Sequence, residues 1–405
     1  MRLTYAAIAF ASALAACAQT PTPTTPIHRS SASPLIVQTV APIRTVTGTD
    51  GQQHLVHELL LVNQSAFVVT IESIASVDAD TSAVLQTLAD NALRSATRLN
   101  LLGEGGTVLQ PAQSAFVFLD VTSPGDALPR ALSHRITVTR TAAAVQGGTL
   151  GGLPVSPVAA SQPTTTFNIP SATIQAERAL VLASPVRGEG WIVFRGCCDV
   201  ASSHRGGAAA FDGEVRITER FALDLVRANS AGMLVTGPGN EPASYPQYGT
   251  TVYAVANGTI ASARNTQPDE PPGQMNPNLP DDLAGGNAVV LDVGGGRFVY
   301  YAHLQPGSVA VRTGDVVKAG DVIGKLGNSG RSFAPHLHLH VSNSAEAGGN
   351  GLPFTFSAFT LRGTLDEDPF ALAQQGRPAT AGANGPTGQR QDQLPLNSSL
   401  VDFAP

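Results

Sequence analysis

The segment Pro335-His336-Leu337-His338-Leu339-His340-Val341 alternates histidine with apolar residues. A period of two is typical of a β-strand, so the three imidazoles should share one face while the apolar residues point to the core. Three histidines on one face are unusual for packing alone, because neutral imidazoles need hydrogen-bond partners and charged ones repel. A zinc ion would organise them, since imidazole is a favoured zinc ligand. A solvated edge strand is the alternative that this motif leaves open.

The composition of the chain is typical of a turn-rich β protein. Hydrophobic residues make up 42% and charged residues 13% of the 405 positions, with 41 Gly and 29 Pro. The length predicts two domains plus tails, and the low charge favours an exported all-β protein over a helical cytosolic one. A formal net charge of -6 gives no basic stripe, so we expect no nucleic acid partner. The oligomeric state is left open.

The first residues predict export. Residues 1–16 have the basic start and short apolar stretch of a signal peptide, and that stretch is too short for a transmembrane helix. The sequence Leu14-Ala15-Ala16-Cys17 resembles the lipobox of bacterial lipoproteins, which implies a membrane anchor on a lipidated Cys17. Ala18 resembles the outer-membrane signal of Gram-negative bacteria, which implies an outer-membrane lipoprotein facing the periplasm. An ordinary cleavage near Ala16 is the alternative, and the protein would then be periplasmic or secreted.

A tether and a first β domain follow the lipobox. Residues 17–34 are rich in Thr, Ser and Pro and predict a flexible, lipid-anchored tether. Residues 35–170 predict a β-sandwich-like domain, because β-branched and aromatic runs are separated by Gly, Pro and Asn. The best helix candidate within this domain is Thr81–Leu99, whose leucines are partly in helical period. Four runs that we expect to be strands begin at His54, Ala66, Ser114 and His134.

The N-terminal module also contains histidines, at positions 28, 54, 57 and 134. His54 and His57 are three apart, which places them on opposite faces of a strand. Nothing in the spacing assembles the four into a metal site. We therefore expect this module to be a spacer or a protein-binding sandwich.

A second β-rich domain is predicted for residues 184–362. Residues 374–405 are rich in Gly, Pro, Ala and Gln near their start and predict a disordered tail. Cys197 and Cys198 are adjacent, and a bond between neighbours closes a strained ring, so we expect local packing with their redox state open.

Five further segments complete a pattern around the histidine strand. They are Gly249-Thr-Thr-Val-Tyr-Ala-Val-Ala-Asn-Gly258, Gly286-Asn-Ala-Val-Val-Leu291, Val299-Tyr-Tyr-Ala-His303-Leu304, Gly314-Asp-Val-Val-Lys-Ala-Gly-Asp-Val-Ile-Gly324 and Gly327-Asn-Ser-Gly330. Together with the His-Leu-His motif they resemble the lysostaphin-type zinc metallopeptidases, a family of peptidoglycan endopeptidases. The resemblance covers roughly residues 190–345. It implies an antiparallel core of two β-sheets of the barrel-sandwich hybrid type, which is the family's duplicated hybrid motif fold.

The resemblance also implies roles for individual residues. The second histidine of the His-Leu-His pair, His338, would bind zinc, while His336 and His303 would act on the substrate and transition state. Asp224 lies in Arg220-Phe-Ala-Leu-Asp224-Leu, which resembles the family's Tyr-Ala-Leu-Asp-Phe variant, and would be a second ligand. An unpaired Asp in an apolar run would be costly to bury, which independently favours a metal partner. A solvent-facing Asp on an edge strand is the alternative.

The third ligand departs from the family pattern. The common spacing is His-x-x-x-Asp, whereas nineteen residues separate His204 from Asp224 here. The segment from Cys197 to His204 resembles a subgroup in which this ligand comes from a longer loop, so His204 is our choice. His340 stands where many relatives have Glu. We expect it to flank the site or to hydrogen-bond a neighbour, and not to be a ligand.

The implied function is that of a zinc endopeptidase acting on peptidoglycan peptides. Two histidines and one carboxylate leave one position of tetrahedral zinc open for a water, whose pKa zinc lowers from 15.7 to about 7. The two assisting histidines would accept the proton of this zinc-activated water and stabilise the oxyanion. One alternative is a non-hydrolytic lipoprotein of the same fold that binds cell wall or regulates a hydrolase. Another is an interaction protein whose His cluster only stores metal.

An insertion also interrupts the predicted peptidase domain. Residues 264–285 contain five prolines and four acidic residues. Such a segment cannot be a helix or a core strand. We expect it to wall the substrate groove.

Overall fold

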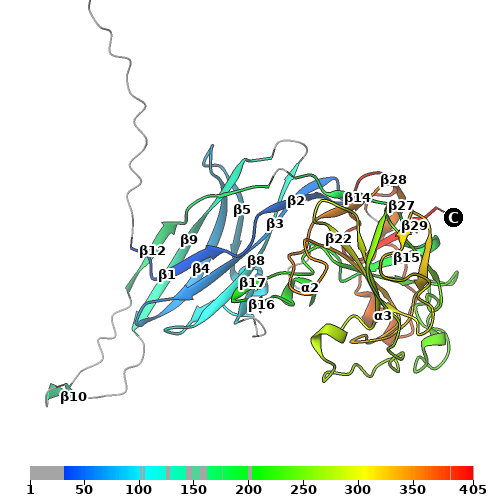
Figure 1. Ribbon diagram of the computed structural model, residues 1–405. Helices are drawn as coiled ribbons and strands as arrows, with labels where there is room; N and C mark the ends of the chain where they lie inside the picture. Colours follow the sequence, from blue (N-terminus) through cyan, green and yellow to red (C-terminus); the bar gives the residue numbers. More distant parts are fainter. Residues whose placement is uncertain are drawn as a thin grey trace, which may run out of the picture. The chain divides into compact units, whose positions relative to one another are not determined.

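The computed structural model describes residues 32–404, except residues 101–102, 104, 125–127, 143–148, 151–152, 155–161, 176, 199–202 and 384. Cys17, His28 and the predicted signal peptide lie outside the described residues. Strands dominate the described part of the chain, which is all-β as the sequence predicted (Figure 1). Residues 34–405 form one compact unit that contains both β-rich modules. The described helices are all too short or too polar to cross a membrane.

The N-terminal module is a sandwich of two antiparallel sheets (Figure 1). In the first sheet the order is β1-β3-β8-β6, with β2 paired to β3. Its strands are β1 (Leu35–Thr39), β2 (Arg44–Thr47), β3 (Gln52–Asn63), β6 (Thr97–Leu99) and β8 (Ser114–Pro124). In the second sheet the order is β12-β9-β4-β5, with β13 on β9 and β7 on β4. Its strands are β4 (Phe67–Asp78), β5 (Val84–Ala89), β7 (Val108–Leu109), β9 (Ala131–Ala142), β12 (Gln162–Asn168) and β13 (Ala172–Thr173). Strand β10 (Thr149–Leu150) pairs antiparallel with β11 (Leu153–Pro154).

Apolar side chains from both sheets fill the space between them. The core comes from every second residue of the long strands, which is the pattern that a sandwich requires. Its members include Leu59, Leu61, Val117, Leu119, Val69, Ile71, Ile136 and Val138. All four runs that the sequence indicated as strands are strands here.

The segment Thr81–Leu99 combines two strands with a short helix and is not the single helix we expected. Strand β5 pairs with β4, β6 pairs with β8, and α1 (Asp90–Ala96) lies between them. Leu88 lies opposite Ile74 in the β5–β4 ladder. Sheet pairing therefore satisfies the backbone groups that we had assigned to a helix.

Two buried histidines, His57 on β3 and His134 on β9, contact each other between the two sheets. Their Nε2 atoms are 3.1 Å apart. The Nδ1–H of His57 donates to the Leu55 carbonyl at 3.2 Å, and the Ser76 hydroxyl donates to Nδ1 of His134 at 3.2 Å. The Nε2–H of His134 then donates to Nε2 of His57. This assignment satisfies every ring nitrogen with both imidazoles neutral.

Acid should destabilise the sandwich through this pair. Burial lowers the pKa of His57 well below its ordinary value and lowers the pKa of His134 to about 4. Unfolded histidine titrates near pH 6.5, so below this pH the unfolded state binds more protons and stability falls as the pH falls. Each ring lowers the free energy of unfolding by up to about 1.4 kcal/mol for every pH unit below 6.5, until the pH reaches the pKa of that ring in the folded protein. Denaturant unfolding at pH 7 and pH 5 measures this loss, and His134→Gln should reduce it. Equal losses in both proteins would contradict the prediction.

The C-terminal module is built on one ten-stranded antiparallel sheet of order β23-β20-β21-β22-β25-β18-β15-β29-β27-β28. Its strands are β15 (Gly188–Phe194), β18 (Leu223–Arg227), β20 (Gly258–Arg264), β21 (Asn287–Asp292), β22 (Phe298–Leu304), β23 (Val316–Val317), β25 (Leu337–Ser342), β27 (Phe359–Thr364), β28 (Gly388–Arg390) and β29 (Ser399–Phe403). Three strand pairs accompany it: β14 (Leu180–Leu182) with β26 (Phe354–Phe356), β16 (Ala209–Phe211) with β17 (Glu214–Arg216), and β19 (Thr251–Tyr253) with β24 (Val322–Lys325). The helical elements are α2 (Ser203–Gly206), η1 (Pro242–Ser244), η2 (Asp281–Leu283) and α3 (Pro369–Gln374).

The β19–β24 pair packs on the large sheet as a second layer. Val252 and Ile323 of the pair share a buried core with Leu291 and Tyr301 of the large sheet. The Val255 N–H donates to the Tyr301 hydroxyl at 2.8 Å. The two-layer arrangement that the sequence predicted is therefore present, with a second layer much smaller than the first.

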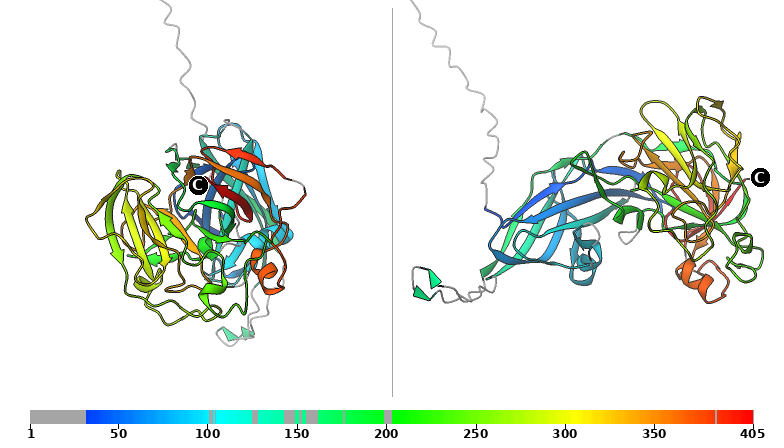
Figure 2. Two further views of the ribbon diagram at one scale, coloured as in Figure 1. Left: turned by 90° about the vertical axis from the view of Figure 1, so that its right-hand side faces the viewer. Right: turned by 60° about the horizontal axis from the view of Figure 1, so that its bottom comes forward.

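Residues 374–405 are not the disordered tail that we expected. Strand β29 pairs with β15 on one side and with β27 on the other, so it lies inside the large sheet (Figures 1 and 2). Val401 and Phe403 are buried in the core of the module. The prediction was wrong because Gly- and Pro-rich sequence precedes a strand of five residues, and an alternation that short does not stand out.

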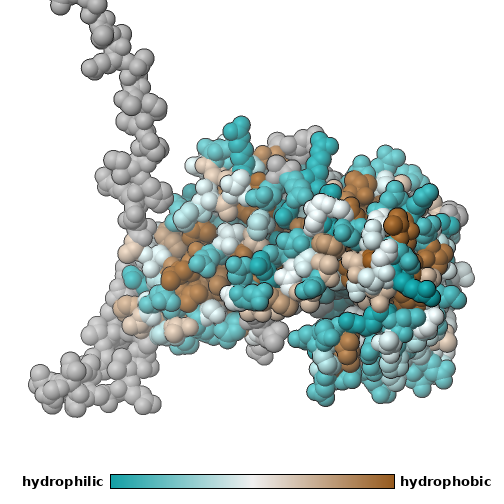
Figure 3. All heavy atoms as spheres, viewed as in Figure 1, coloured by the Kyte–Doolittle hydropathy of each residue, from teal (hydrophilic) through white to brown (hydrophobic). Residues whose placement is uncertain are grey.

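The surface of the unit mixes apolar and polar side chains (Figure 3). Ile36 on β1, for example, is 47% exposed. Apolar atoms contribute much of the surface of any folded protein, so exposed apolar residues carry little information, whereas buried polar residues carry more.

Candidate active site

Cross-strand pairing brings Asp224 and His338 together. Strands β18 and β25 are adjacent and antiparallel, and their register places Asp224 directly opposite His338. Oδ1 of Asp224 lies 3.0 Å from Nδ1 of His338, and both side chains are buried. Leu337, Leu339 and Val341 point into the core, as the alternation predicted. Opposite residues are the closest neighbours that an antiparallel pair offers, so the sheet register builds this half of the site.

His204 reaches the same point from α2. Its Nε2 is 3.3 Å from Oδ1 of Asp224, and its Nδ1–H donates to the Arg195 carbonyl at 2.8 Å. Arg195 directly follows β15, whose last residue, Phe194, lies opposite Asp224. Pairing of β15 with β18 therefore brings His204 close to Asp224, although nineteen residues separate the two in the sequence.

The three residues fit a zinc ion. Ligand atoms of His204, Asp224 and His338 all lie within 4.8 Å of one another, and all three side chains are buried. Two imidazole nitrogens and one carboxylate oxygen form a donor set that Zn²⁺ favours. His204 presents Nε2 and His338 presents Nδ1, because their other ring nitrogens face hydrogen-bond partners.

The charges at this point also favour a cation. Burial alone would lower the pKa of His204, but the Asp224 carboxylate overrides burial and raises this pKa to about 9. Burial alone would raise the pKa of Asp224, yet His204 and His336 hold it well below its ordinary value. A carboxylate that stays ionised while buried needs a positive partner. A metal ion can replace the proton of His204 in that role.

His303 and His336 lie beside the three candidate ligands. Their ring centroids are 4.5 Å apart, and Nε2 of His336 is 3.5 Å from Oδ1 of Asp224. The Nδ1–H of His303 donates to the Ser329 carbonyl at 2.7 Å, and the Nδ1–H of His336 donates to the Ala334 carbonyl at 2.8 Å. These bonds leave Nε2 of each ring as a proton acceptor.

Both of these histidines are suited to act as bases. Burial lowers the pKa of His336, and burial together with His336 lowers the pKa of His303 well below its ordinary value, so both rings are neutral at pH 7. His303 also has a φ of 61°, which is rare for a residue other than glycine. Backbone bonds from its N–H to the Gly285 carbonyl and from the Gly327 N–H to its own carbonyl, at 2.9 and 3.0 Å, fix this conformation. Strained residues of this kind cluster at functional sites.

The last histidine of the motif, His340, lies next to His338 on β25. Nδ1 of His340 is 2.8 Å from Nε2 of His338. Oε1 of Glu219 is 3.5 Å from the same Nε2 of His338. His340 also stacks on Tyr300, with ring centroids 4.4 Å apart. These acceptors hold the His338 ring with Nδ1 toward Asp224. His340 thus bonds a neighbour, as expected. Glu219 could not be predicted as a site residue, because it belongs to no motif in the sequence.

A cavity of about 600 Å³ lies next to the residue that precedes His336. Its lining includes Pro335, which directly precedes His336, and the aromatic rings of Phe333 and Phe370, whose centroids are 5.4 Å apart. Residues 264–285 contribute Pro272 and Gly273 to the lining, and that this insertion walls the substrate groove stays a prediction. The Gly273 N–H donates to the Phe333 carbonyl at 2.8 Å and attaches the insertion there.

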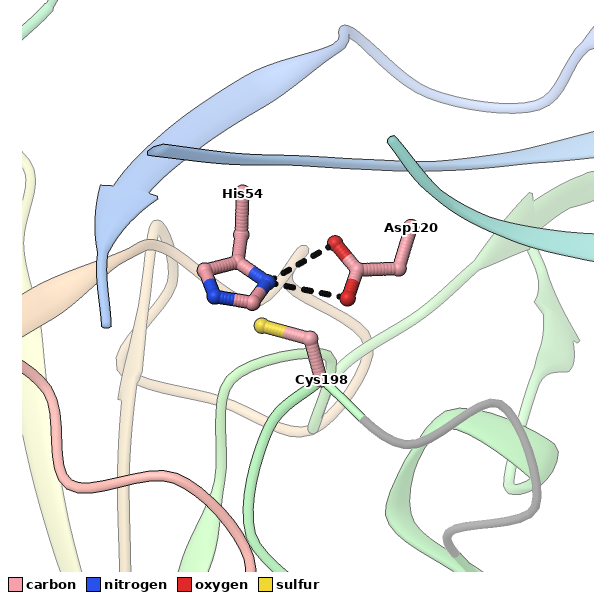
Figure 4. A group of neighbouring side chains, drawn as sticks. All are labelled: His54, Asp120 and Cys198. Carbon is pink, nitrogen blue, oxygen red and sulfur yellow. Dashed lines mark hydrogen bonds and ion pairs between the residues drawn. The ribbon is translucent and has the colours of Figure 1, made fainter. Parts of the chain in front are cut away.

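A second group of potential ligands lies elsewhere, at His54, Asp120 and Cys198 (Figure 4). Nδ1 of His54 is 2.9 Å from the Asp120 carboxylate. Cys198 is joined to Cys197 by a disulfide, so the pair that we expected to pack locally is oxidised here. A disulfide sulfur is not a thiolate, which is the form that binds metals. We therefore interpret this group as an ion pair beside a disulfide.

Residues 244–349 match the family model of "Peptidase family M23". This segment is an M23 peptidase domain. It contains His303, His336 and His338, whereas His204 and Asp224 precede it. The candidate metal site therefore joins the M23 segment to strands and a helix that lie before it in the chain.

Two curated relatives are similar to about a quarter of the chain. Lysostaphin from Staphylococcus staphylolyticus is 35% identical over 116 residues, which cover 27% of this chain and 20% of that protein. Glycyl-glycine endopeptidase ALE-1 from Staphylococcus capitis is 36% identical over 98 residues, which cover 24% of this chain and 22% of that protein. The chain thus spans about a fifth of the length of these relatives. Among solved structures, the catalytic domain of lysostaphin from Staphylococcus simulans is 24% identical, with 33% of this chain and 71% of that chain covered and a TM-score of 0.20.

Proposed function

We propose that this protein is a zinc-dependent endopeptidase that hydrolyses peptide bonds of bacterial peptidoglycan. The convergence of His204, Asp224 and His338, with His303 and His336 beside them, carries the proposal. The M23 domain supports a peptidase, and the name of the relative ALE-1, a glycyl-glycine endopeptidase, supports cleavage within a peptide. The resemblance of the motifs to cell-wall endopeptidases supports peptidoglycan as the substrate.

The side chains at the site suggest how they take part in hydrolysis. Zinc held by His204, Asp224 and His338 supplies a Lewis acid that polarises a carbonyl and makes water more acidic. His303 and His336 are neutral and unprotonated at Nε2, so one of them would accept the proton of the attacking water. The resulting imidazolium gives this proton to the leaving amine and returns to its neutral form. His340 keeps the His338 ring in place through Nε2.

We also propose that the protein is an exported lipoprotein of the outer membrane that faces the periplasm. The lipobox-like sequence at Leu14–Cys17 supports an acyl anchor on Cys17, and residues 17–34 would tether the enzyme near the wall. Acyl chains that remained on a Cys17→Ser variant would refute this anchor.

The experiment that tests the enzyme measures zinc in the mature protein beside muropeptide release from purified sacculi. We expect about one zinc ion per chain, release of soluble muropeptides, and loss of release on chelation that added zinc restores. Protein that carries no zinc and releases nothing would overturn the proposal. Zinc without release would favour the non-hydrolytic alternative.

A further inference from the structure

The residue next to His204 attaches α2 to the N-terminal sandwich. The side chain of Arg205 is buried and donates to Oε1 of Glu58 on β3, with Nη2 at 2.9 Å and Nε at 3.2 Å. Nη2 also donates to the carbonyls of His57 and Leu119 at 3.1 Å each. One guanidinium of the C-terminal module therefore binds both β3 and β8 of the sandwich.

Glu58 also binds a second arginine of the C-terminal module. Nε of Arg220 is 3.2 Å from Oε1 of Glu58, and its Nη2 donates to Oε2. Arg220 directly follows Glu219 and leads into β18, which carries Asp224. All three charged side chains of this triad are almost fully buried. Forked pairs between guanidinium and carboxylate are strong and directional, so one carboxylate fixes both segments that lead to candidate ligands.

The strand period explains why Glu58 faces the C-terminal module. His54, Val56 and Glu58 alternate along β3 and share the face opposite to His57. Val56 is buried in the same core cluster as the strands of the large sheet. His54 lies beside Cys198, at the start of the loop that leads to α2 (Figure 4). This face of the sandwich therefore packs against the C-terminal module and is buried there.

The segment that carries His204 depends on these contacts. Helix α2 has only four residues, and a helix this short is not stable by its own hydrogen bonds. Besides the bond from His204 to the Arg195 carbonyl, its described attachments include those of Arg205 to Glu58, His57 and Leu119. Arg205 also donates to the Cys198 carbonyl at 3.4 Å.

We propose that Glu58 is a positioning residue of the metal centre, which through Arg205 holds His204 beside Asp224 and His338. The sandwich is then part of the peptidase and not a spacer. The proposal rests on the zinc site of the proposed function. It also accounts for the unusual distance in sequence between His204 and Asp224, because the sandwich supplies the support that a nearby strand would otherwise give.

The test replaces Arg205 by methionine in the full mature chain. Arg205→Met keeps an apolar stem next to Phe118, whose ring lies 5.4 Å from the guanidinium carbon, and leaves Glu58 paired with Arg220. We expect the dissociation constant for Zn²⁺, measured by competition with a chelating dye, to rise about tenfold or more. The matched control is His134→Gln, which alters the sandwich interior but leaves in place Glu58 and the backbone carbonyls that accept hydrogen bonds from Arg205. Its affinity should stay within about twofold of the wild type.

The outcomes separate this proposal from the proposed function. Wild-type affinity in Arg205→Met, whether or not the zinc-free protein loses thermal stability, would refute the positioning role and leave the zinc site standing. A wild-type chain that binds no zinc would instead refute the proposed function. If Arg205→Met does not fold, Arg205→Lys takes its place, since lysine keeps the charge but loses the forked contact. A rise in the dissociation constant is again expected, and an unchanged value would refute the proposal.

Discussion

Replacing His338 by alanine is expected to remove bound zinc and to abolish muropeptide release from sacculi. His338 offers Nδ1 at 3.0 Å from Asp224, and its loss leaves His204 and Asp224 as the remaining candidate ligands. A bound zinc ion would contribute several kcal/mol to transition-state stabilisation, so the rate should fall by about 10³-fold or more. Metal analysis of the purified variant and its rate of muropeptide release measure the two effects.

The same variant distinguishes the enzyme from its alternatives. If the protein has no hydrolytic activity and acts only by binding cell wall or a partner protein, His338→Ala should keep that binding and therefore its full function. His134→Gln is a suitable control, because it also removes an imidazole but lies in the sandwich. Hydrolysis at the wild-type rate in His338→Ala would show that the metal site is wrong.

Replacing His336 or His303 by alanine is expected to slow hydrolysis by about 10²–10⁴-fold while zinc stays bound. The Nδ1–H of each ring is bonded to a backbone carbonyl, at Ala334 and Ser329 respectively, so Nε2 is the nitrogen that can accept a proton. Neither ring is needed to complete the ligand set of His204, Asp224 and His338. Zinc content and the rate of muropeptide release under substrate saturation check the two parts of this prediction.

The double variant His303→Ala/His336→Ala adds a further check. If the two histidines act as a unit, the double variant should be little slower than the slower single variant. Loss of zinc from either single variant would contradict the prediction, because that histidine would then be a ligand.

The histidine strand could be predicted from sequence because its physics is local. A period of two predicts His336, His338 and His340 on one face; in the structure His338 and His340 contact each other on β25, while His336 directly precedes this strand. The partner of His338, Asp224, lies far from it in the sequence. It could still be predicted as a site residue, because an Asp within an apolar strand indicates a buried positive neighbour. The structure places that Asp directly opposite His338.

The contacts that hold the segment around His204 could not be predicted from a local sequence pattern. The contact between Arg205 and Glu58 joins side chains of two modules, and its only local sign is a charged residue in an apolar strand. Glu58 lies between Val56 and Leu60 in a run that we interpreted only as a strand. Contacts of this kind depend on how the modules pack, which no short-range pattern encodes.

The place of β29 makes the large sheet depend on a segment that follows every candidate site residue in the sequence. This strand lies between β15 and β27, and β15 pairs in turn with β18, which carries Asp224. Residues 399–403 are therefore needed to keep the sheet continuous beside the candidate ligands. Removal of this one strand would expose the edges of β15 and β27, and exposed edges of this kind are the surfaces through which β-sheets of different molecules aggregate.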